Sequence, residues 1–482
     1  MTFTAETYQQ RRRALIQNMD SGLVFLLGND NVGMSYRDNH YPYFRQDSTF
    51  LYYIGIDLPE LSAIIDIDSG QTTVYGNDVT VDSMVWTGPQ PSLDTLIRER
   101  GIQAHASPDK LSETLAKAKS QGRNIHFLPP YRGDHDLAYM RLLGLDQESV
   151  AQAASRSLIQ AIVKQRSYKT EVELGELAKA VQLTNRMHLT AMRVARPGMT
   201  EAEVMAKVHA EALGADSYVS FPIIMTVHGE ILHNHHHHNK LTEDRLLLVD
   251  CGGESPLHYC GDMTRTFPVA SSFTTRHKEV YEVALDAQLA AIDALKPGVL
   301  YKDVHLLAAT RIVEGLKALG IMKGDVQEAV AAGAHAMFFP HGLGHMMGLD
   351  VHDMENLGED YVGYTDIIQR NPQFGLKSLR LGRALEAGFV ITVEPGIYFI
   401  PGLIDQWGAA GKCKEFIDYN VLEGYRDFGG IRIEDDYVIT PDGARLLGAP
   451  VPKTVTDVHD MENLGEDYVG YTDIIQRNPQ FG

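Results

Sequence analysis

The chain contains the stretch LLLVDCGGESPLHYCGDMTRTF at residues 246–267. The apolar run that ends at Asp250 predicts a buried strand, and a second strand is expected around Asp262, because the glycines and the proline between them favour a turn. A hairpin of this kind would bring the two carboxylates side by side. Like charges at close range are costly unless a cation holds them, so the pair predicts a metal site. A turn aspartate and an unrelated surface aspartate would explain either residue taken alone.

Three more metal-binding side chains follow in comparable contexts. His345 belongs to HGLGHMMG, where the glycines favour a loop over a helix. Glu394 lies in the apolar run ITVEPGIY, and Glu434 follows IRI, where strand alternation puts Arg432 and Glu434 on one face. An acidic side chain inside an apolar strand is costly unless it is paired or metal-bound. Four carboxylates and one imidazole form an oxygen-rich set that suits Mn²⁺, Co²⁺ or Zn²⁺. Placed together, they predict a centre with two divalent ions and a shared, activated water.

The bulk composition is that of a globular protein with two or three domains. The chain has 482 residues and 44% hydrophobic content, which is ample for packed cores. The net charge of −20 argues against a nucleic-acid partner, which requires a basic surface. No apolar run reaches the length of a membrane span, the polar N-terminus lacks a signal-peptide pattern, and three cysteines do not make a disulfide framework. We therefore expect a cytoplasmic protein with no membrane or nucleic-acid partner.

Two domains are expected along the chain. Residues 1–160 combine short apolar strands at 22–28, 61–68 and 72–76 with helical stretches such as 108–119, which predicts an α/β domain, and the turn DSGQ predicts a hairpin. In residues 168–450 the order helix, Pro-Gly turn, helix, strands occurs twice. Capping boxes at 170–173 and 200–203 begin the first two helices, and further helices are expected near 275–295 and from 301 to 319. This pseudo-repeat predicts two halves that supply ligands to one site.

The set of motifs resembles the Xaa-Pro aminopeptidase (aminopeptidase P) and prolidase branch of the pita-bread metallopeptidases. All five ligand contexts occur in the order of that family, and YFRQDS at residues 43–48 is similar to the signature of its N-terminal domain. The resemblance covers about residues 1–450. It implies an α/β (α+β) fold in which an aminopeptidase P-type N-terminal domain precedes a pita-bread catalytic domain with a pseudo-twofold internal repeat.

The resemblance also implies a role for each residue of the site. Asp262 and Glu434 would bridge the two ions, and Glu394 would also move the proton of the attacking water. The hardness of the ligands favours Mn²⁺, with Zn²⁺ or Co²⁺ as alternatives. His352 would stabilise the tetrahedral intermediate. The full set is metal ligands Asp250, Asp262, His345, Glu394 and Glu434; catalytic residues Glu394, His352 and His233; and substrate-binding or supporting residues His341, Arg380 and Arg432.

The implied reaction is hydrolysis of the bond between an N-terminal residue and a following proline. The implied partners are a peptide with proline at the second position and further copies of the chain, in a dimer or tetramer. A prolidase restricted to dipeptides is the alternative: PGIYFIPGLID and Arg380 favour it, whereas SPLHYCGD favours an aminopeptidase P. A catalytically inert binding module on the same scaffold is a remoter alternative, which the five intact ligands disfavour.

Two segments remain outside this assignment. Residues 457–482 repeat residues 350–375 letter for letter, and no further copies exist. We interpret the second copy as a recent duplication or an artefact of the sequence and expect no function of it. The run His235–His238 is expected to be an exposed loop that binds stray metal weakly.

Overall fold

The computed structural model describes residues 2–462 and divides into two compact units. The first unit takes the chain up to residue 166 together with residues 354–362, and the second takes 167–353 and the chain from 363 onward. The division after residue 166 falls between the two domains expected from the sequence, whereas the transfer of 354–362 to the first unit was not expected. Among the described residues, no helix is long and apolar enough to cross a membrane.

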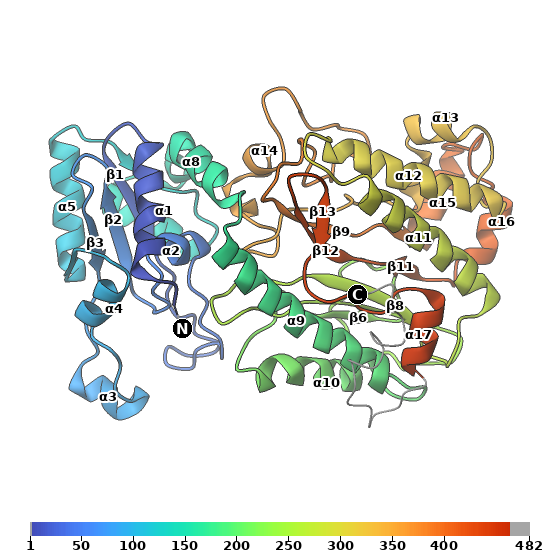
Figure 1. Cartoon of the computed structure of the whole chain (residues 1–482), viewed down its shortest axis with the longest axis horizontal. Helices are drawn as coiled ribbons and strands as arrows, with labels where there is room; N and C mark the ends of the chain where they lie inside the picture. The colour runs from blue at the N-terminus through green and yellow to red at the C-terminus, as the bar shows by residue number, and fades with distance from the viewer. Residues whose placement is uncertain (1, 463–482) are drawn as a thin grey trace. The chain divides into compact units, whose positions relative to one another are not determined.

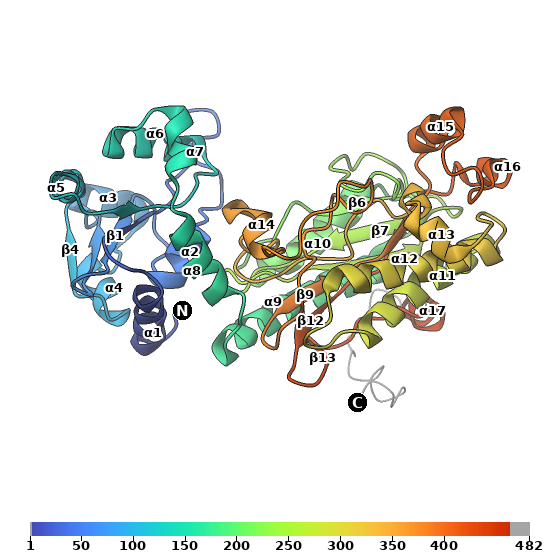
Figure 2. The same cartoon turned by 90° about the horizontal axis from the view of Figure 1, so that it is seen from above.

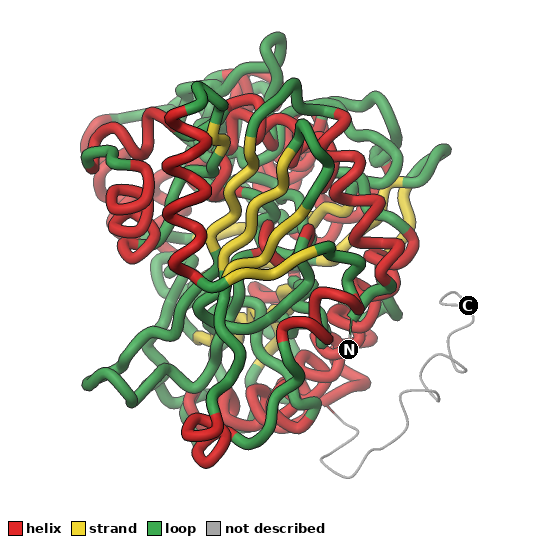
Figure 3. The backbone as a smooth tube through the Cα atoms, turned by 90° about the vertical axis from the view of Figure 1, so that its left-hand side faces the viewer, coloured by secondary structure: helices red, strands yellow, loops and turns green. Residues whose placement is uncertain are grey.

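The first unit, whose residues up to 166 are blue to teal in Figure 1, is built on a mixed five-stranded sheet of order β4-β3-β2-β1-β5. Ile65 pairs with Thr72 across the antiparallel strands β2 and β3, which confirms the predicted hairpin. Helices flank the sheet in Figure 3, and Leu111, Leu115 and Tyr139 pack in the same apolar cluster as Phe25 of β1. The elements are α1 Ala5–Gln17, β1 Leu23–Leu27, α2 Ser48–Tyr53, β2 Ser62–Asp66, β3 Thr72–Tyr75, α3 Val81–Thr87, α4 Leu93–Glu99, β4 Ala104–Ala106, α5 Pro108–Ser120, β5 Ile125–His126, α6 Gly133–Leu143, α7 Gln147–Ala153, α8 Arg156–Arg166, η2 Glu355–Leu357 and α14 Glu359–Val362.

The second unit repeats one arrangement twice. Helices α9 and α10 precede the antiparallel sheet β6-β7-β8, and helices α11 and α12 precede the sheet β13-β12-β9. The two helices of each half lie side by side in Figures 1 and 2. The capping boxes of α9 and α10 are present as predicted. The elements are α9 Glu171–Val194, α10 Glu201–Gly214, β6 Ile224–Thr226, β7 Leu246–Cys251, β8 Met263–Pro268, α11 Thr275–Asp293, α12 Tyr301–Ala318, α13 Val326–Ala331, η1 Ala334–Met337, β9 Val390–Val393, β10 Gly396–Tyr398, α15 Pro401–Ala410, α16 Tyr419–Leu422, η3 Glu423–Tyr425, β11 Gly430–Arg432, β12 Asp435–Ile439, β13 Ala444–Leu446 and α17 Val455–Glu462.

Each half presents two carboxylates at neighbouring strand ends. Asp250 is the penultimate residue of β7 and Asp262 directly precedes β8, which pairs antiparallel with β7, so the predicted hairpin is confirmed. In the second half Glu394 directly follows β9, and Glu434 directly precedes β12, the antiparallel partner of β9. The sequence placed Glu394 within a strand, but Pro395 cannot donate to a sheet and the strand ends one residue earlier.

Candidate active site

A cavity of about 670 Å³ in the second unit collects the residues singled out in the sequence. Its walls come from both halves, because the ends of β7 and β8 meet the ends of β9 and β12 there. A concave cavity that combines apolar walls with a few convergent charged groups is the usual form of a binding or catalytic site. The predicted residues that line it are Asp250, Asp262, His345, Glu394, Glu434, His233, His341, His352, Arg380 and Arg432.

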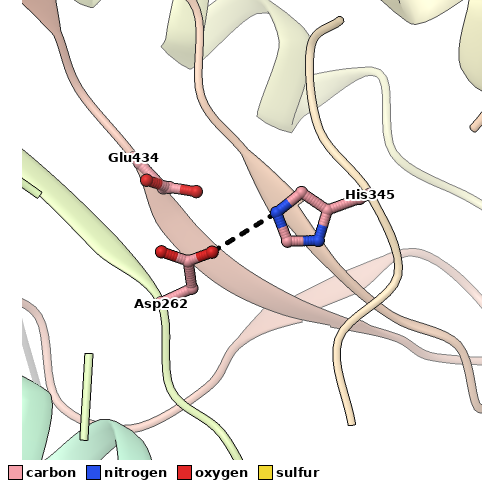
Figure 4. A group of neighbouring side chains, drawn as sticks. All are labelled: Asp262, His345 and Glu434. Atoms are coloured by element: carbon pink, nitrogen blue, oxygen red, sulfur yellow. Dashed lines mark ion pairs between the residues drawn. The ribbon is translucent and has the colours of Figure 1, made fainter. Parts of the chain in front are cut away.

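Three of the five predicted metal ligands form a close cluster at the base of the cavity. Asp262, His345 and Glu434 each offer one donor atom, and these atoms all lie within 4.8 Å of one another. Figure 4 shows the two carboxylates and the imidazole facing a common point. The Nε2 atom of His345 lies 3.3 Å from Oδ2 of Asp262 and 3.6 Å from Oε1 of Glu394. Glu394 therefore borders the cluster on the imidazole side.

Asp250 is held by an arginine from the other half. Arg432 donates from Nη2 to Oδ2 of Asp250 at 2.6 Å, and both side chains are almost fully buried. The other Asp250 oxygen, Oδ1, is buried and has no hydrogen-bond partner within the described part of the chain. A buried carboxylate oxygen without a partner is costly, so a cation is the group that this position fits best.

The sequence placed Arg432 and Glu434 on one strand face, and in the structure Arg432 reaches Glu434 through Thr264. Its Nε donates to Oγ1 of Thr264 at 3.1 Å, and that hydroxyl in turn donates to Oε2 of Glu434 at 2.6 Å. Nη1 donates to the hydroxyl of Tyr398 at 2.8 Å. The guanidinium is thus occupied by protein groups, and we interpret its role as holding Asp250 in place.

Burial raises the pKa of three carboxyl groups of the cavity, which are Asp262, Glu434 and Glu394. Burial first, and then the charge of Asp250, raises the pKa of Asp262 well above its ordinary value. Burial and the charge of Asp262 do the same for the pKa of Glu434. Burial raises the pKa of Glu394 to about 7. Such a concentration of buried acids is stable in the ionised form only with opposite charge among them.

The donor set fits divalent metal ions. Nδ1 of His345 lies 3.0 Å from the carbonyl oxygen of Met346, and a ring nitrogen in that position donates its hydrogen. The same arrangement leaves the lone pair of Nε2 directed at Asp262. A histidine whose second nitrogen is fixed by a carbonyl is the common form of a metal ligand. Together with the four carboxylates, it makes a hard, negatively charged site.

The other three predicted histidines lie around the metal-ligand cluster and differ in how far they are buried. The ring of His352 contacts the ring of His345 edge to face, with centroids 4.2 Å apart. His341 faces the hydroxyl of Tyr398 through Nε2 at 2.8 Å, and burial lowers its pKa to about 3, so it is neutral. His233 is exposed and lines the wall of the cavity beside His235. His235, the first residue of the run His235–His238, thus belongs to the cavity wall.

Sequence reasoning missed two residues that organise the base. Tyr398 is fully buried and places its hydroxyl between His341 and Arg432. Thr264 links Arg432 to Glu434 through its hydroxyl. Their positions beside ligand motifs, in EPGIY and GDMT, were the available signal, because polar residues within apolar strands near a metal site tend to bond to the ligands.

Comparisons with known proteins agree with this geometry. The sequence model of metallopeptidase family M24 matches residues 175–441, and that of the aminopeptidase P N-terminal domain matches residues 8–126. Human Xaa-Pro dipeptidase is 33% identical over 427 residues, which cover 86% of this chain and 83% of the relative. The match to family M24 spans both halves of the second unit, which together supply the cavity.

Two further relatives carry the other name of this group. A probable Xaa-Pro aminopeptidase from Sordaria macrospora is 32% identical over 471 residues, 96% of each protein. The structure of E. coli aminopeptidase P with the inhibitor Pro-Leu superposes with a TM-score of 0.78 at 28% identity, covering 96% of this chain and 99% of that one. The similarity therefore extends over both units.

Proposed function

The chain belongs to metallopeptidase family M24, with an aminopeptidase P N-terminal domain, and from this premise we propose that it is an Xaa-Pro aminopeptidase, a hydrolase that removes an N-terminal residue from a following proline. It has the pita-bread fold of that group. The observation that carries the proposal is the convergence of four carboxylates and His345, from both halves of the second unit, on one cavity.

We propose Asp250, Asp262, His345, Glu394 and Glu434 as the ligands of two divalent ions. Such ions, when bound, lower the pKa of a water and polarise a scissile carbonyl. The hard oxygen donors favour Mn²⁺, with Zn²⁺ and Co²⁺ as alternatives. Oδ1 of Asp250 has no hydrogen-bond partner among the described residues, and the pKa values of Asp262 and Glu434 are raised. Both features support this set, because each calls for positive charge in the cavity.

The side chains of the cavity perform the proton transfers of the reaction. Glu394, whose pKa of about 7 suits general acid and base work, accepts the proton of the attacking water and delivers it to the proline nitrogen. His352 lies beside the cluster and donates a hydrogen bond to the developing oxyanion. His233 and neutral His341 face the substrate from the cavity wall.

Arg380 lines the cavity and bears on whether the enzyme cleaves only dipeptides or also longer peptides. An arginine there suits a carboxylate at the end of a short substrate, as a dipeptidase requires. We place the activity with the aminopeptidases, in agreement with relatives of that name that match almost the whole chain. Assays with an Xaa-Pro dipeptide and an Xaa-Pro-Pro tripeptide distinguish the aminopeptidase from the dipeptidase. An enzyme that cleaves the dipeptide but not the tripeptide would be a dipeptidase.

The test of the metal centre pairs metal analysis with one matched variant. The purified protein is expected to contain two divalent ions per chain, to lose activity on dialysis against a chelator and to regain it with Mn²⁺. Asp262→Asn, which keeps the shape and removes the charge, should abolish activity and metal binding, whereas Glu243→Gln on the exposed turn before β7 should change neither. A protein that binds no divalent ion, or an active Asp262→Asn, would contradict the proposal.

We also propose that the enzyme is a homo-oligomer in the cytoplasm. Helix α3 has no buried residue and exposes Val81, Val85 and Trp86, the last to 87%. Exposed apolar side chains clustered on one helix favour contact with another protein surface. The three cysteines are free, which suits a reducing compartment. Light scattering on the purified chain tests the first statement, and a monomer would contradict it.

A further inference from the structure

Two fully buried polar side chains lie behind the strands that carry the ligands. His188 belongs to α9 and Gln288 to α11, and neither lines the cavity. His188 precedes Pro197 by nine residues and Gln288 precedes Pro297 by nine residues. The two side chains therefore occupy equivalent positions in the two halves of the second unit.

His188 joins the two strands of the first ligand pair. Its Nε2 lies 3.3 Å from the carbonyl oxygen of Cys251 and 2.9 Å from that of Met263. These residues directly follow Asp250 and Asp262, and they face each other across β7 and β8. A ring nitrogen that faces two carbonyl oxygens has to carry a hydrogen, so His188 is the Nε2–H tautomer and donates to both strands. Its Nδ1 has no hydrogen-bond partner within residues 2–462.

Thr184, one turn earlier on α9, adds a third point of attachment. Its hydroxyl accepts from the backbone N–H of Gly253 at 3.0 Å. A Cβ on Gly261 would lie only 2.4 Å from the same hydroxyl, so the helix approaches the hairpin more closely than a side chain would allow. Helix α9 thus fixes the backbone on either side of the turn between Asp250 and Asp262.

Gln288 performs the corresponding task in the second half. Its Nε2 donates to the carbonyl oxygen of Val393 at 3.3 Å and to Oδ2 of Asp435 at 3.1 Å. Val393 directly precedes Glu394, Asp435 directly follows Glu434, and the two face each other across β9 and β12. Its Oε1 accepts from Lys453, so the amide is fixed at both ends.

We propose that His188 and Gln288 are a matched pair of positioning residues, each of which sets the spacing of two ligand strands and through it the affinity of the metal centre. The inference rests on the proposed metal centre. Removal of His188 takes a donor from the carbonyl oxygens of Cys251 and Met263. Removal of Gln288 takes a donor from the carbonyl oxygen of Val393 and from Asp435, whose carboxylate still accepts from Arg265 and Lys453. The strands then shift to recover the lost hydrogen bonds. The carboxylates move with the strands, and the affinity for metal ions depends on the distances between these carboxylates.

The test measures dissociation constants for Mn²⁺ by calorimetry rather than activity. His188→Leu fills the space without a donor and should weaken the binding of at least one ion by about 10- to 100-fold, the usual effect of removing a partner behind a metal ligand. His188→Gln keeps a donor at the same reach and should remain close to the parent. Gln288→Leu should reproduce the loss from the other half.

Met192→Ala is the matched control. Met192 is a buried residue of α9 that packs in the apolar cluster of the first half, so its truncation should lower the unfolding midpoint and leave the dissociation constants unchanged. If His188→Leu does not fold, His188→Asn, which is too short to reach both carbonyls, gives the same comparison.

The outcomes separate this inference from the proposed function. A parent that binds two ions together with a His188→Leu variant of unchanged affinity overturns the inference alone. Equal weakening in Met192→Ala and His188→Leu also overturns it, because the effect would then be one of general stability. A parent that binds no divalent ion overturns the proposed function and this inference with it.

Discussion

The sequence DVHDME occurs at residues 350–355 and again at 457–462, and the two copies have different structures. The first copy has no regular structure at 350–353, and its His352 lines the cavity. The second copy lies within helix α17. Identical residues have identical local preferences, so the difference has to come from the flanking residues and from tertiary contacts.

The first copy is held in place by a buried ion pair. Asp353 accepts from Nζ of Lys169 at 2.8 Å, and both side chains are 1% exposed. The backbone N–H of Asp353 donates to the carbonyl oxygen of Met346, in the loop that carries His345. These contacts fix the loop next to His352, and they are specific to this place in the fold.

The second copy is held by a helix cap and by apolar packing. The backbone N–H of Asp457 donates to the hydroxyl of Thr454 at 3.1 Å, and the Asp457 carboxylate accepts from the N–H of Thr454. This reciprocal pattern begins a helix, and the first copy has Met347 in place of the threonine. Val458 is fully buried in the apolar cluster that includes Met187 of α9. The residues that flank each copy therefore determine its secondary structure, and its position in the fold determines whether its histidine lines the cavity.

The largest expected difference between the copies is catalytic. His352→Ala should lower kcat/KM by about 10²- to 10³-fold, the usual cost of removing a donor to an oxyanion. His459→Ala, the same substitution in the second copy, should leave kcat/KM unchanged. Steady-state assays on an Xaa-Pro substrate measure both.

Metal content and thermal unfolding of the two variants serve as controls. Both should retain two ions, because His352 is not a proposed ligand. A comparable loss of activity in both variants, or none in His352→Ala, would remove the functional distinction between the copies.

The sequence predicted which acidic residues gather at one cavity, because the cost of an acid in an apolar context can be read locally. Asp250, Asp262 and Glu434 each stand at the edge of an apolar run, and the structure brings them to one cavity. The helices around the Pro-Gly turns were predicted for a similar reason, since capping boxes and periodicity are local signals.

The contacts that support the ligands could not be predicted from local signals. Arg432 and Asp250 are 182 residues apart in the chain, and Lys169 and Asp353 are 184 apart, so only the fold shows that they pair. The duplicated segment is the reverse case. Its helix does have a local signal, the capping box of Thr454 and Asp457, but this signal needs Thr454, which lies outside the repeated residues.

Two truncated chains should show which residues of the second copy contribute to the stability of the fold. A chain that ends at Thr456 loses Val458 together with most of α17 and should unfold more easily by about 2–3 kcal/mol, the upper part of the range for burying such a side chain. A chain that ends at Glu462 keeps α17 and should match the full chain. Chemical denaturation measures the difference, and kcat/KM below the transition should be the same for all three.

Equal stability of the two truncated chains would mean that α17 contributes nothing to the fold. A loss of activity in the chain that ends at Glu462 would contradict our assignment of no function to the last residues, 463–482, which lie outside the described structure.

A smaller effect should follow from the valine that the copies share. Val458→Ala removes two buried methyl groups and should lower the free energy of unfolding by about 1.5–2 kcal/mol at about 0.8 kcal/mol for each group. Val351→Ala should cost less, because Val351 is partly exposed at the cavity, and it should raise KM instead. Chemical denaturation and steady-state kinetics on both variants measure the stability and KM. A rise of KM in Val458→Ala, or a larger loss of stability in Val351→Ala, would show that we assigned the two environments wrongly.

The smallest effect concerns the flank that makes the copies differ. Thr454→Ala removes the hydroxyl that caps α17 and should destabilise this helix by about 1 kcal/mol. Thr456→Ala, at an exposed position inside the same helix, should be neutral or slightly stabilising, since alanine is the better helix former. Amide hydrogen exchange of the α17 backbone measures both, because it reports local opening even where the global stability hardly changes. If exchange in Thr454→Ala equals that of the parent, the cap does not select the helix, and the packing of Val458 alone separates the second copy from the first.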